Sequence, residues 1–138
     1  MRFEGKSVLI TGAGKGIGRE TAKLMAARGA KVTAVSRTQS DLEALQAEIG
    51  CTTITVDLAD ADAARLAARQ GLPCDYLVNC AGINVLQPFV DVTVESFDLV
   101  HAVNTRAAMI VAQEFARGRI QQGGGGADGL SSPADQRP

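Results

Sequence analysis

The stretch TGAGKGIG, residues 11–18, follows a short β-branched run and precedes a segment of helical periodicity. In such a strand–loop–helix unit, Gly12 allows a tight turn, and Gly16 lets the backbone approach a pyrophosphate held by the N–H groups of the helix N-terminus. Gly18 then permits close packing of the helix on the sheet. The lysine is followed by glycine rather than Ser or Thr, which excludes a nucleoside-triphosphate P-loop. An ordinary turn is the alternative, and the context favours a dinucleotide-binding loop. Its expected cofactor-binding residues are Gly12, Lys15, Gly16, Ile17 and Gly18.

Four short apolar runs alternate with four segments of helical periodicity. The runs are residues 7–11, 31–36, 52–56 and 75–79. Each is nearly continuous in apolar character, as strands buried on both faces of a parallel sheet are. The helical segments are residues 16–28, 40–49, 60–70 and 94–117. This alternation predicts an α/β fold, a Rossmann-type doubly wound parallel sheet truncated to about four strands and four helices, with right-handed crossovers.

The helical periodicity also predicts which side chains face the sheet. In the first helix, Ile17, Leu24 and Met25 share one side. The third helix is rich in alanine, and Leu66 is expected to anchor it. In the long fourth helix, Phe97, Val100, Val111 and Phe115 belong to one apolar stripe.

Composition places the chain among ordinary soluble globular proteins. Its 138 residues fit one domain, and a net charge of −1 suggests no nucleic acid or anionic membrane as a partner. No apolar run approaches the roughly 18 residues of a spanning helix, and no signal-peptide pattern opens the sequence, so we expect a cytoplasmic protein. Three cysteines without Cys-x-x-Cys spacing and a single histidine argue against a disulfide framework and a metal site.

The end of the second predicted strand indicates which cofactor binds. Sites for NAD usually place an acid about 20 residues after the glycine loop, where it bonds the ribose 2′-hydroxyl. Here Ser36, Arg37 and Thr38 occupy that position, and no acid is among them. A guanidinium forms charge-assisted hydrogen bonds with a 2′-phosphate, which a carboxylate would repel. A solvated surface arginine is the alternative, but the position and the missing acid together favour NADP.

These motifs resemble those of the short-chain dehydrogenase/reductase family, whose glycine motif is Thr-Gly-x-x-x-Gly-x-Gly. Asp57-Leu58 matches the position where the family's Asp contacts adenine, and residues 79–82 match Asn-Asn-Ala-Gly with a departure at Cys80. Asn104 matches the catalytic-site Asn, whose backbone helps to hold a proton-relay water. The resemblance therefore implies a catalytic role for Asn104. It also implies cofactor contacts for Asp57, Leu58, Asn79, Ala81 and Gly82.

Within the family, the stretches VLITGAGKGIGRET, VSRTQSDLEAL and LQPFVDVTVESFD are most similar to the carbonyl reductase/L-xylulose reductase group. That group reduces dicarbonyls and ketoses with NADPH, which agrees with the independent interpretation of Arg37. The resemblance implies a small carbonyl or sugar substrate. It also implies a homo-oligomer that assembles through the 94–117 helix.

The resemblance covers residues 1–117, which we interpret as an NADP-binding Rossmann half-domain. Residues 118–138 are rich in glycine and proline and contain neither tyrosine nor lysine. We expect them to form a disordered tail, because they offer little apolar surface to bury. The family's catalytic Ser, Tyr and Lys would follow residue 117, and Tyr76, the only tyrosine, lies in the fourth predicted strand. Two hypotheses remain: an NADP(H)-dependent oxidoreductase truncated before these residues, or a catalytically silent nucleotide-binding fragment.

Overall fold

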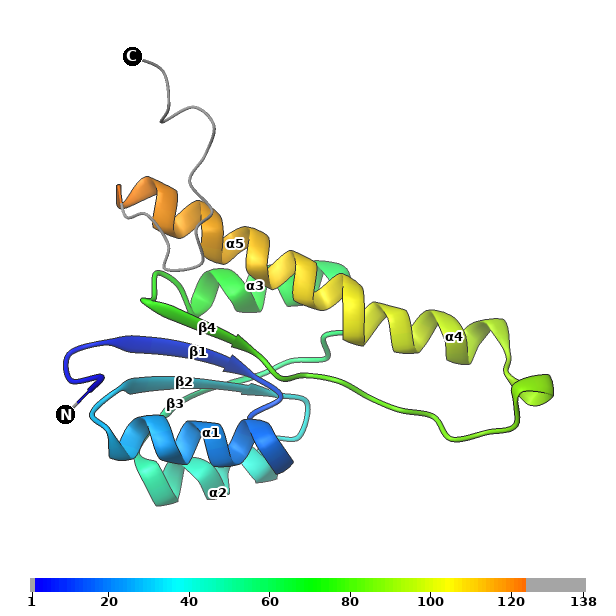
Figure 1. Ribbon diagram of the computed structural model, residues 1–138, viewed down its shortest axis with the longest axis horizontal. Helices are drawn as coiled ribbons and strands as arrows, with labels where there is room; N and C mark the ends of the chain where they lie inside the picture. The colour runs from blue at the N-terminus through cyan, green and yellow to red at the C-terminus, as the bar shows by residue number, and fades with distance from the viewer. Residues whose placement is uncertain (1, 124–138) are drawn as a thin grey trace, which may run out of the picture.

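A four-stranded parallel sheet lies between two layers of helices in the computed structural model, which describes residues 2–123 (Figure 1). Its strands stand in the order β3-β2-β1-β4, and each neighbouring pair is parallel. They are β1 (Ser7–Thr11), β2 (Lys31–Ser36), β3 (Thr52–Thr55) and β4 (Tyr76–Asn79). Helices cover both faces, which confirms the predicted doubly wound α/β class.

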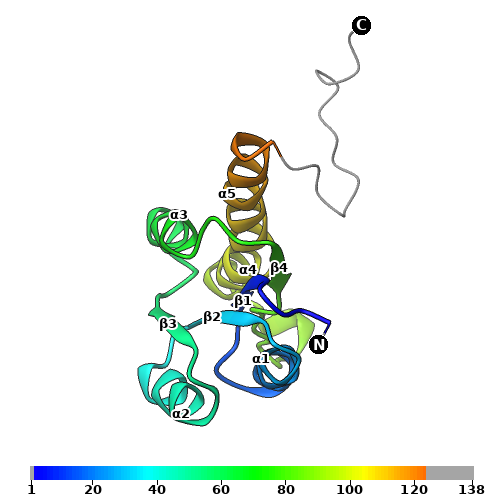
Figure 2. The same ribbon diagram turned by 90° about the vertical axis from the view of Figure 1, so that its left-hand side faces the viewer.

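The helices divide between the two faces of the sheet. In both views, α1 and α2 lie on one side and α3 and α5 on the other (Figures 1 and 2). The bounds are α1 (Gly16–Ala27), α2 (Gln39–Ile49), α3 (Ala61–Gln70), α4 (Val94–His101) and α5 (Ala107–Gln121). A short 3-10 turn, η1 (Phe89–Asp91), precedes α4, and a π-helical turn, η2 (Ala102–Arg106), joins α4 to α5. The predicted fourth helix is therefore this α4–η2–α5 unit.

The long helix ends at Gln121, so residues 118–121 are helical rather than part of a tail. Arg119 gives a physical reason for the difference, since its guanidinium lies 3.6 Å from the Asp75 carboxylate. This ion pair ties the last turns of α5 to the segment that enters β4. The rest of the predicted tail, residues 124–138, lies outside the described residues.

The core consists of two clusters, one on each face of the sheet. Alternation along β1 sends Val8 and Ile10 toward α1 and α2, and Leu9 toward α3 and α5. The first cluster also includes Ala22, Met25, Val32, Ala34, Leu42 and Leu45. The second includes Val35, Ala64, Ala68, Ala107, Ile110 and Val111. Strands buried on both faces explain the nearly continuous apolar runs of the sequence.

Two of the three residues predicted to face the sheet from α1 are exposed. Ile17 is 81% exposed and Leu24 is also exposed, because α1 turns Gly18, Ala22 and Met25 toward the sheet instead. Gly18 lies one residue, or about 100°, from Ile17 around the helix, and Met25 belongs to both the predicted and the observed stripe.

Leu66 is 59% exposed, because α3 packs through Ala64, Ala67 and Ala68. In both helices the small residues allow close approach, and the larger side chains are left outside. Of the predicted stripe on the long helix, Val111 is buried, whereas Phe97 is exposed.

Parallel pairing brings the carboxyl ends of all four strands to one edge of the sheet (Figure 1). The loops that follow these strands therefore meet there, which is where open α/β sheets bind ligands. None of the helices within residues 2–123 has the length and apolar character that a membrane crossing requires.

Candidate cofactor site

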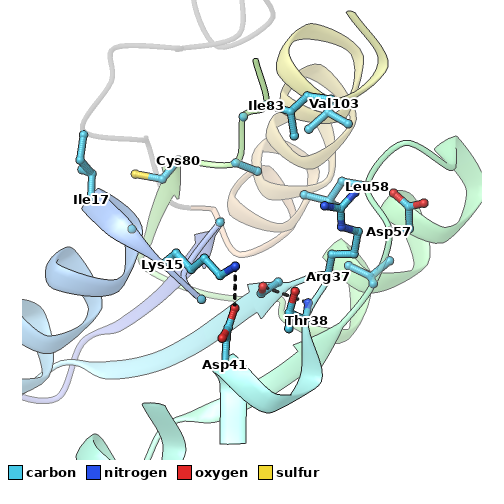
Figure 3. Close-up of a pocket in the computed structure, with 17 residues that line it drawn as sticks. Lys15, Ile17, Arg37, Thr38, Asp41, Asp57, Leu58, Cys80, Ile83 and Val103 are labelled. Carbon is cyan, nitrogen blue, oxygen red and sulfur yellow. Dashed lines mark hydrogen bonds and ion pairs between the residues drawn. The ribbon is translucent and has the colours of Figure 1, made fainter. Parts of the chain in front are cut away.

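A cavity of about 350 Å³ opens at the carboxyl ends of the strands, lined by residues from the loops after all four (Figure 3). The predicted site residues that line it are Gly12, Lys15, Ile17, Gly18, Ser36, Arg37, Thr38, Asp57, Leu58, Ala81 and Gly82. The cavity also has lining residues that the sequence did not single out: Gly14, Asp41, Val56, Cys80, Ile83 and Val103. Gly16, Asn79 and Asn104 were predicted site residues but are not among the lining residues.

Two glycines let the loop after β1 pack against its neighbours. Gly12 has a φ of +66°, and a Cβ there would stand 2.7 Å from the backbone of Ala81. A Cβ on Gly18 would overlap the carbonyl oxygen of Gly12. The expected tight turn and close helix packing are therefore both present, and any side chain would separate β1, α1 and the loop after β4.

The N-terminus of α1 is open to an anion. Its N-cap residue, Lys15, has an extended backbone and makes no side-chain capping bond, and no acid lies in the first turn. Gly16 has a φ of +54°, and nothing lies within 4 Å of where its Cβ would be. Positive helix-dipole charge, free N–H groups and empty space thus coincide, and a pyrophosphate fits this arrangement.

The end of β2 brings basic groups and one acid to the cavity. Ser36 accepts a hydrogen bond from the Thr38 backbone N–H at 3.3 Å, and Arg37, between them, is exposed on the cavity wall. The Lys15 ammonium points toward Asp41, whose Oδ2 is 3.7 Å from Nζ (Figure 3). The sequence of the β2 end contains no acid, because Asp41 belongs to the first turn of α2 rather than to the strand end.

Asp57 and Leu58 form the wall after β3. The Asp57 carboxylate accepts a hydrogen bond from the Ala59 N–H at 3.0 Å, and Leu58 is buried. Val56 also lines the cavity here. This wall offers an apolar surface beside a fixed carboxylate, and a planar ring fits such a surface.

Hydrogen bonds hold the loop after β4 to β1 and to the π-helical turn. The Ala81 N–H donates to the Thr11 hydroxyl at 3.2 Å, which ties the loop to β1. The Asn104 carboxamide accepts from the Ile83 N–H at 2.8 Å and donates to the Ile83 carbonyl at 2.9 Å. Asn104 lies in the π-helical turn, and such turns often mark functional sites. Its side chain thus holds the loop to the helix.

Asn79 and the cysteines complete this region. Asn79 donates to the Ala108 carbonyl at 3.5 Å and so faces the long helix rather than the cavity. The three cysteines are free, and burial raises the pKa of the Cys74 thiol to about 11. Cys80, which is half-buried, lines the cavity. Within residues 2–123, no three His, Cys, Asp or Glu side chains gather where they could hold a metal ion.

Comparison with known proteins agrees with this geometry. The family model described as short chain dehydrogenase matches residues 6–135. L-xylulose reductase of Mesocricetus auratus is 50% identical over 135 residues, which cover 96% of this chain and 55% of that protein. Carbonyl reductase [NADPH] 2 of Sus scrofa is 45% identical over 124 residues, which cover 89% of this chain and 51% of that protein.

Solved structures show the same likeness. A short chain dehydrogenase from Burkholderia cenocepacia, in complex with NADP, superposes with a TM-score of 0.82 at 34% identity, covering 86% of this chain and 52% of that one. The chain spans about half the length of the relatives and structures that it matches. The chain belongs to the short chain dehydrogenase family.

Proposed function

We propose that this chain binds NADP(H), and that its function is NADP(H)-dependent oxidoreduction of a small carbonyl compound or ketose. The observation that carries the proposal is the pairing of an open α1 N-terminus with two cations, Lys15 and Arg37, on one cavity. Relatives named L-xylulose reductase and carbonyl reductase [NADPH] 2, and a structural neighbour solved with NADP, support it.

Each part of the cavity suits one part of this cofactor. The α1 N-terminus with Gly16 would hold the pyrophosphate, and Arg37 with Lys15 and Thr38 would hold the ribose 2′-phosphate. The wall of Asp57 and Leu58 would receive the adenine. When bound, the cofactor supplies or accepts a hydride.

The loop after β4 would flank the remainder of the cofactor. We propose that Ala81 and Gly82 contact it directly, and that Asn79 helps to fix the strand end from which they emerge. Asn104 would serve the site through its two bonds to Ile83 and through the backbone of the π-helical turn. These residues orient the cofactor, and residues 118–138 add no tyrosine or lysine that could protonate a carbonyl oxygen.

The second candidate function is nucleotide binding without turnover by this chain. The absence of Tyr and Lys after residue 117 favours it, because protonation of the carbonyl oxygen needs a positioned acid. Both candidates require the same cofactor cavity, so cofactor affinity tests what they share. Turnover distinguishes them.

Equilibrium binding of NADP and NAD to the chain and to Arg37→Ala tests the cofactor proposal. We expect the parent chain to prefer NADP. Loss of the charge-assisted contact should cost about 1.5–3 kcal/mol with NADP and little with NAD. Arg28→Ala is the control, because Arg28 is exposed at the C-terminal end of α1, away from the cavity. Equal affinities of the parent chain for the two cofactors would contradict the proposal.

A further inference from the structure

Asp41 is an acidic residue that lines the cavity in which we propose that a phosphate binds. A carboxylate repels a phosphate, so its position there needs an explanation. Its Oδ2 atom is inaccessible to solvent and accepts no hydrogen bond from the described residues. A buried carboxylate oxygen without a partner is costly. The Lys15 ammonium, 3.7 Å away, is the cation that can offset this cost.

Asp41 is held in place by three neighbouring parts of the chain. A Cβ on Gly14 would stand 2.6 Å from the Ser36 hydroxyl and 3.2 Å from the Asp41 Cβ, so the glycine loop, the end of β2 and the first turn of α2 are in contact. The Arg19 guanidinium donates to the Asp41 carbonyl at 3.4 Å. These contacts fix the backbone and the Cβ of Asp41 beside the cavity, and the carboxylate lies 3.7 Å from the Lys15 ammonium.

Lys15 is the movable partner of this pair. Its side chain is 80% exposed, and the ion pair with Asp41 is the interaction that the structure gives its ammonium. A free lysine side chain samples many rotamers and loses that entropy when it binds a phosphate. An acid that restricts the ammonium to the cavity reduces this loss.

Two electrostatic effects of Asp41 compete. A bare carboxylate on the cavity would repel a phosphate, whereas a carboxylate paired with Lys15 is neutralised and orients a cation. The oxygen nearest the ammonium is the one that solvent does not reach, so a ligand in the cavity cannot contact it without a rearrangement. Lys15, in contrast, is open to the ligand.

We propose that Asp41 is a positioning residue that acts through Lys15. It holds the ammonium on the cavity that Arg37 also lines, and thereby favours a cofactor with a ribose 2′-phosphate over one without. This inference rests on the proposed NADP(H) function and adds to it a determinant of cofactor preference outside the β2 end.

A double-mutant cycle on NADP and NAD binding, with folding checked by circular dichroism, tests the inference. We expect Asp41→Asn, which keeps the shape and removes the charge, to weaken NADP binding about two- to five-fold, as for an exposed ion pair, and to leave NAD binding unchanged. In a Lys15→Gln background the same change should have no effect, and in an Arg37→Gln background it should persist. Asp62→Asn, an exposed first-turn acid of α3, is the matched control.

The remaining outcomes would overturn the inference in distinguishable ways. Tighter NADP binding by Asp41→Asn would show direct repulsion, and an equal loss with both cofactors would show a purely structural role. If the parent chain prefers NADP because of Arg37, and Asp41→Asn changes neither cofactor affinity, the positioning role of Asp41 is wrong and the proposed function stands. A parent chain that binds neither cofactor would defeat the proposed function and this inference with it.

Discussion

Gly16 differs from the other two glycines of the loop motif in what surrounds it. Its φ of +54° lies in the left-handed region, and the space beside its Cα is empty. Gly12 and Gly18, in contrast, face backbone atoms at contact distance. The fold therefore needs Gly12 and Gly18 for packing, whereas a side chain on Gly16 would meet no part of the chain and would enter the space that we propose for the pyrophosphate.

We expect Gly16→Val to abolish nucleotide binding while most of the secondary structure persists. The valine would occupy the space proposed for the pyrophosphate, and a β-branched residue at this φ should cost about 1–3 kcal/mol of stability. Cofactor titration and circular dichroism would measure the two effects separately.

Gly50→Val is the matched control, because Gly50 also has a positive φ and open space at its Cβ position, but lies at the C-terminal end of α2. It should lose similar stability and keep its affinity. A folded Gly16→Val chain that still binds NADP would show that the loop is an ordinary turn.

The candidate site residues that lie next to strand ends could be predicted from the sequence. The residues whose position depends on the orientation of a helix could not. Arg37 directly follows β2 and Asp57 lies two residues after β3, so the parallel sheet alone brings them to the cavity. Asp41 lies one turn into α2, and its direction depends on where that helix begins. The side-chain bonds of Asn104 to Ile83 depend on the π-helical turn, which no periodicity in the sequence indicated.

At the scale of secondary structure, a buried acid joins α3 to α5. The Glu114 carboxylate is 7% exposed, and three guanidinium groups surround it: Arg65 at 2.6 Å, Arg117 at 2.7 Å and Arg69 at 3.3 Å. The hydrogen bond from Arg65, followed by the bond and charge of Arg69 and the charge of Arg117, lowers the pKa of Glu114. The residues that α3 buries are alanines, which allow this close approach to α5.

Glu114→Gln should lower the midpoint of urea unfolding at pH 7, because it removes the charge that three arginines share. The native pKa of Glu114 lies below its unfolded value, so the stabilisation is complete above the ordinary glutamate pKa of about 4.3 and is lost as pH falls through the lowered native pKa. The difference between parent and variant should therefore shrink in acid.

Urea unfolding from pH 7 down to the acid transition would measure this difference. Glu43→Gln, an exposed change on α2, is the control and should shift the midpoint little. A difference between parent and Glu114→Gln that did not vary with pH would mean that the ion cluster contributes through shape alone.

Strands and element order were readable from the sequence, whereas helix faces were not. The apolar runs, and the glycines that separate the segments of the chain, locate the strands to within one residue. The face of α3 was misread because Leu66 is its largest apolar residue, yet three alanines make the contact. Close packing selects small side chains, and a periodicity argument weighted by hydrophobicity overlooks them.

At the scale of the whole molecule, the chain has the proposed cofactor cavity and about half the length of its relatives. We expect the 138-residue chain to show no carbonyl reductase activity with NADPH on dicarbonyls or ketoses, because no Tyr or Lys follows residue 117. Oxidation of NADPH followed by absorbance would measure it, with full-length L-xylulose reductase as the positive control. Turnover that survives rigorous purification would require another acid in this chain.

Two surfaces of the described residues are open to association. β4 pairs with β1 on one side and has no second neighbour in the described sheet. The segment from the end of β4 to α4 extends away from the sheet (Figure 1) and carries exposed apolar residues. They are Val85, Leu86, Phe89, Val90, Val92, Val94 and Phe97. Val111 of the long helix, in contrast, is buried against the sheet.

We therefore expect the isolated chain to self-associate at micromolar concentration and to bind dyes that report apolar surface. Leu86 is 90% and Phe89 91% exposed, and large apolar surface exposed in this way is typical of interaction sites. An unpaired strand edge adds main-chain donors and acceptors that a second chain can meet. Sedimentation of the parent chain and of Leu86→Ser/Phe89→Ser would measure the effect, and the variant should shift toward monomer. Leu24→Ser, an exposed change on α1 at the opposite face of the sheet, is the control. A parent chain that sediments as a single monomeric species and binds no dye would show that residues outside the described range cover these surfaces.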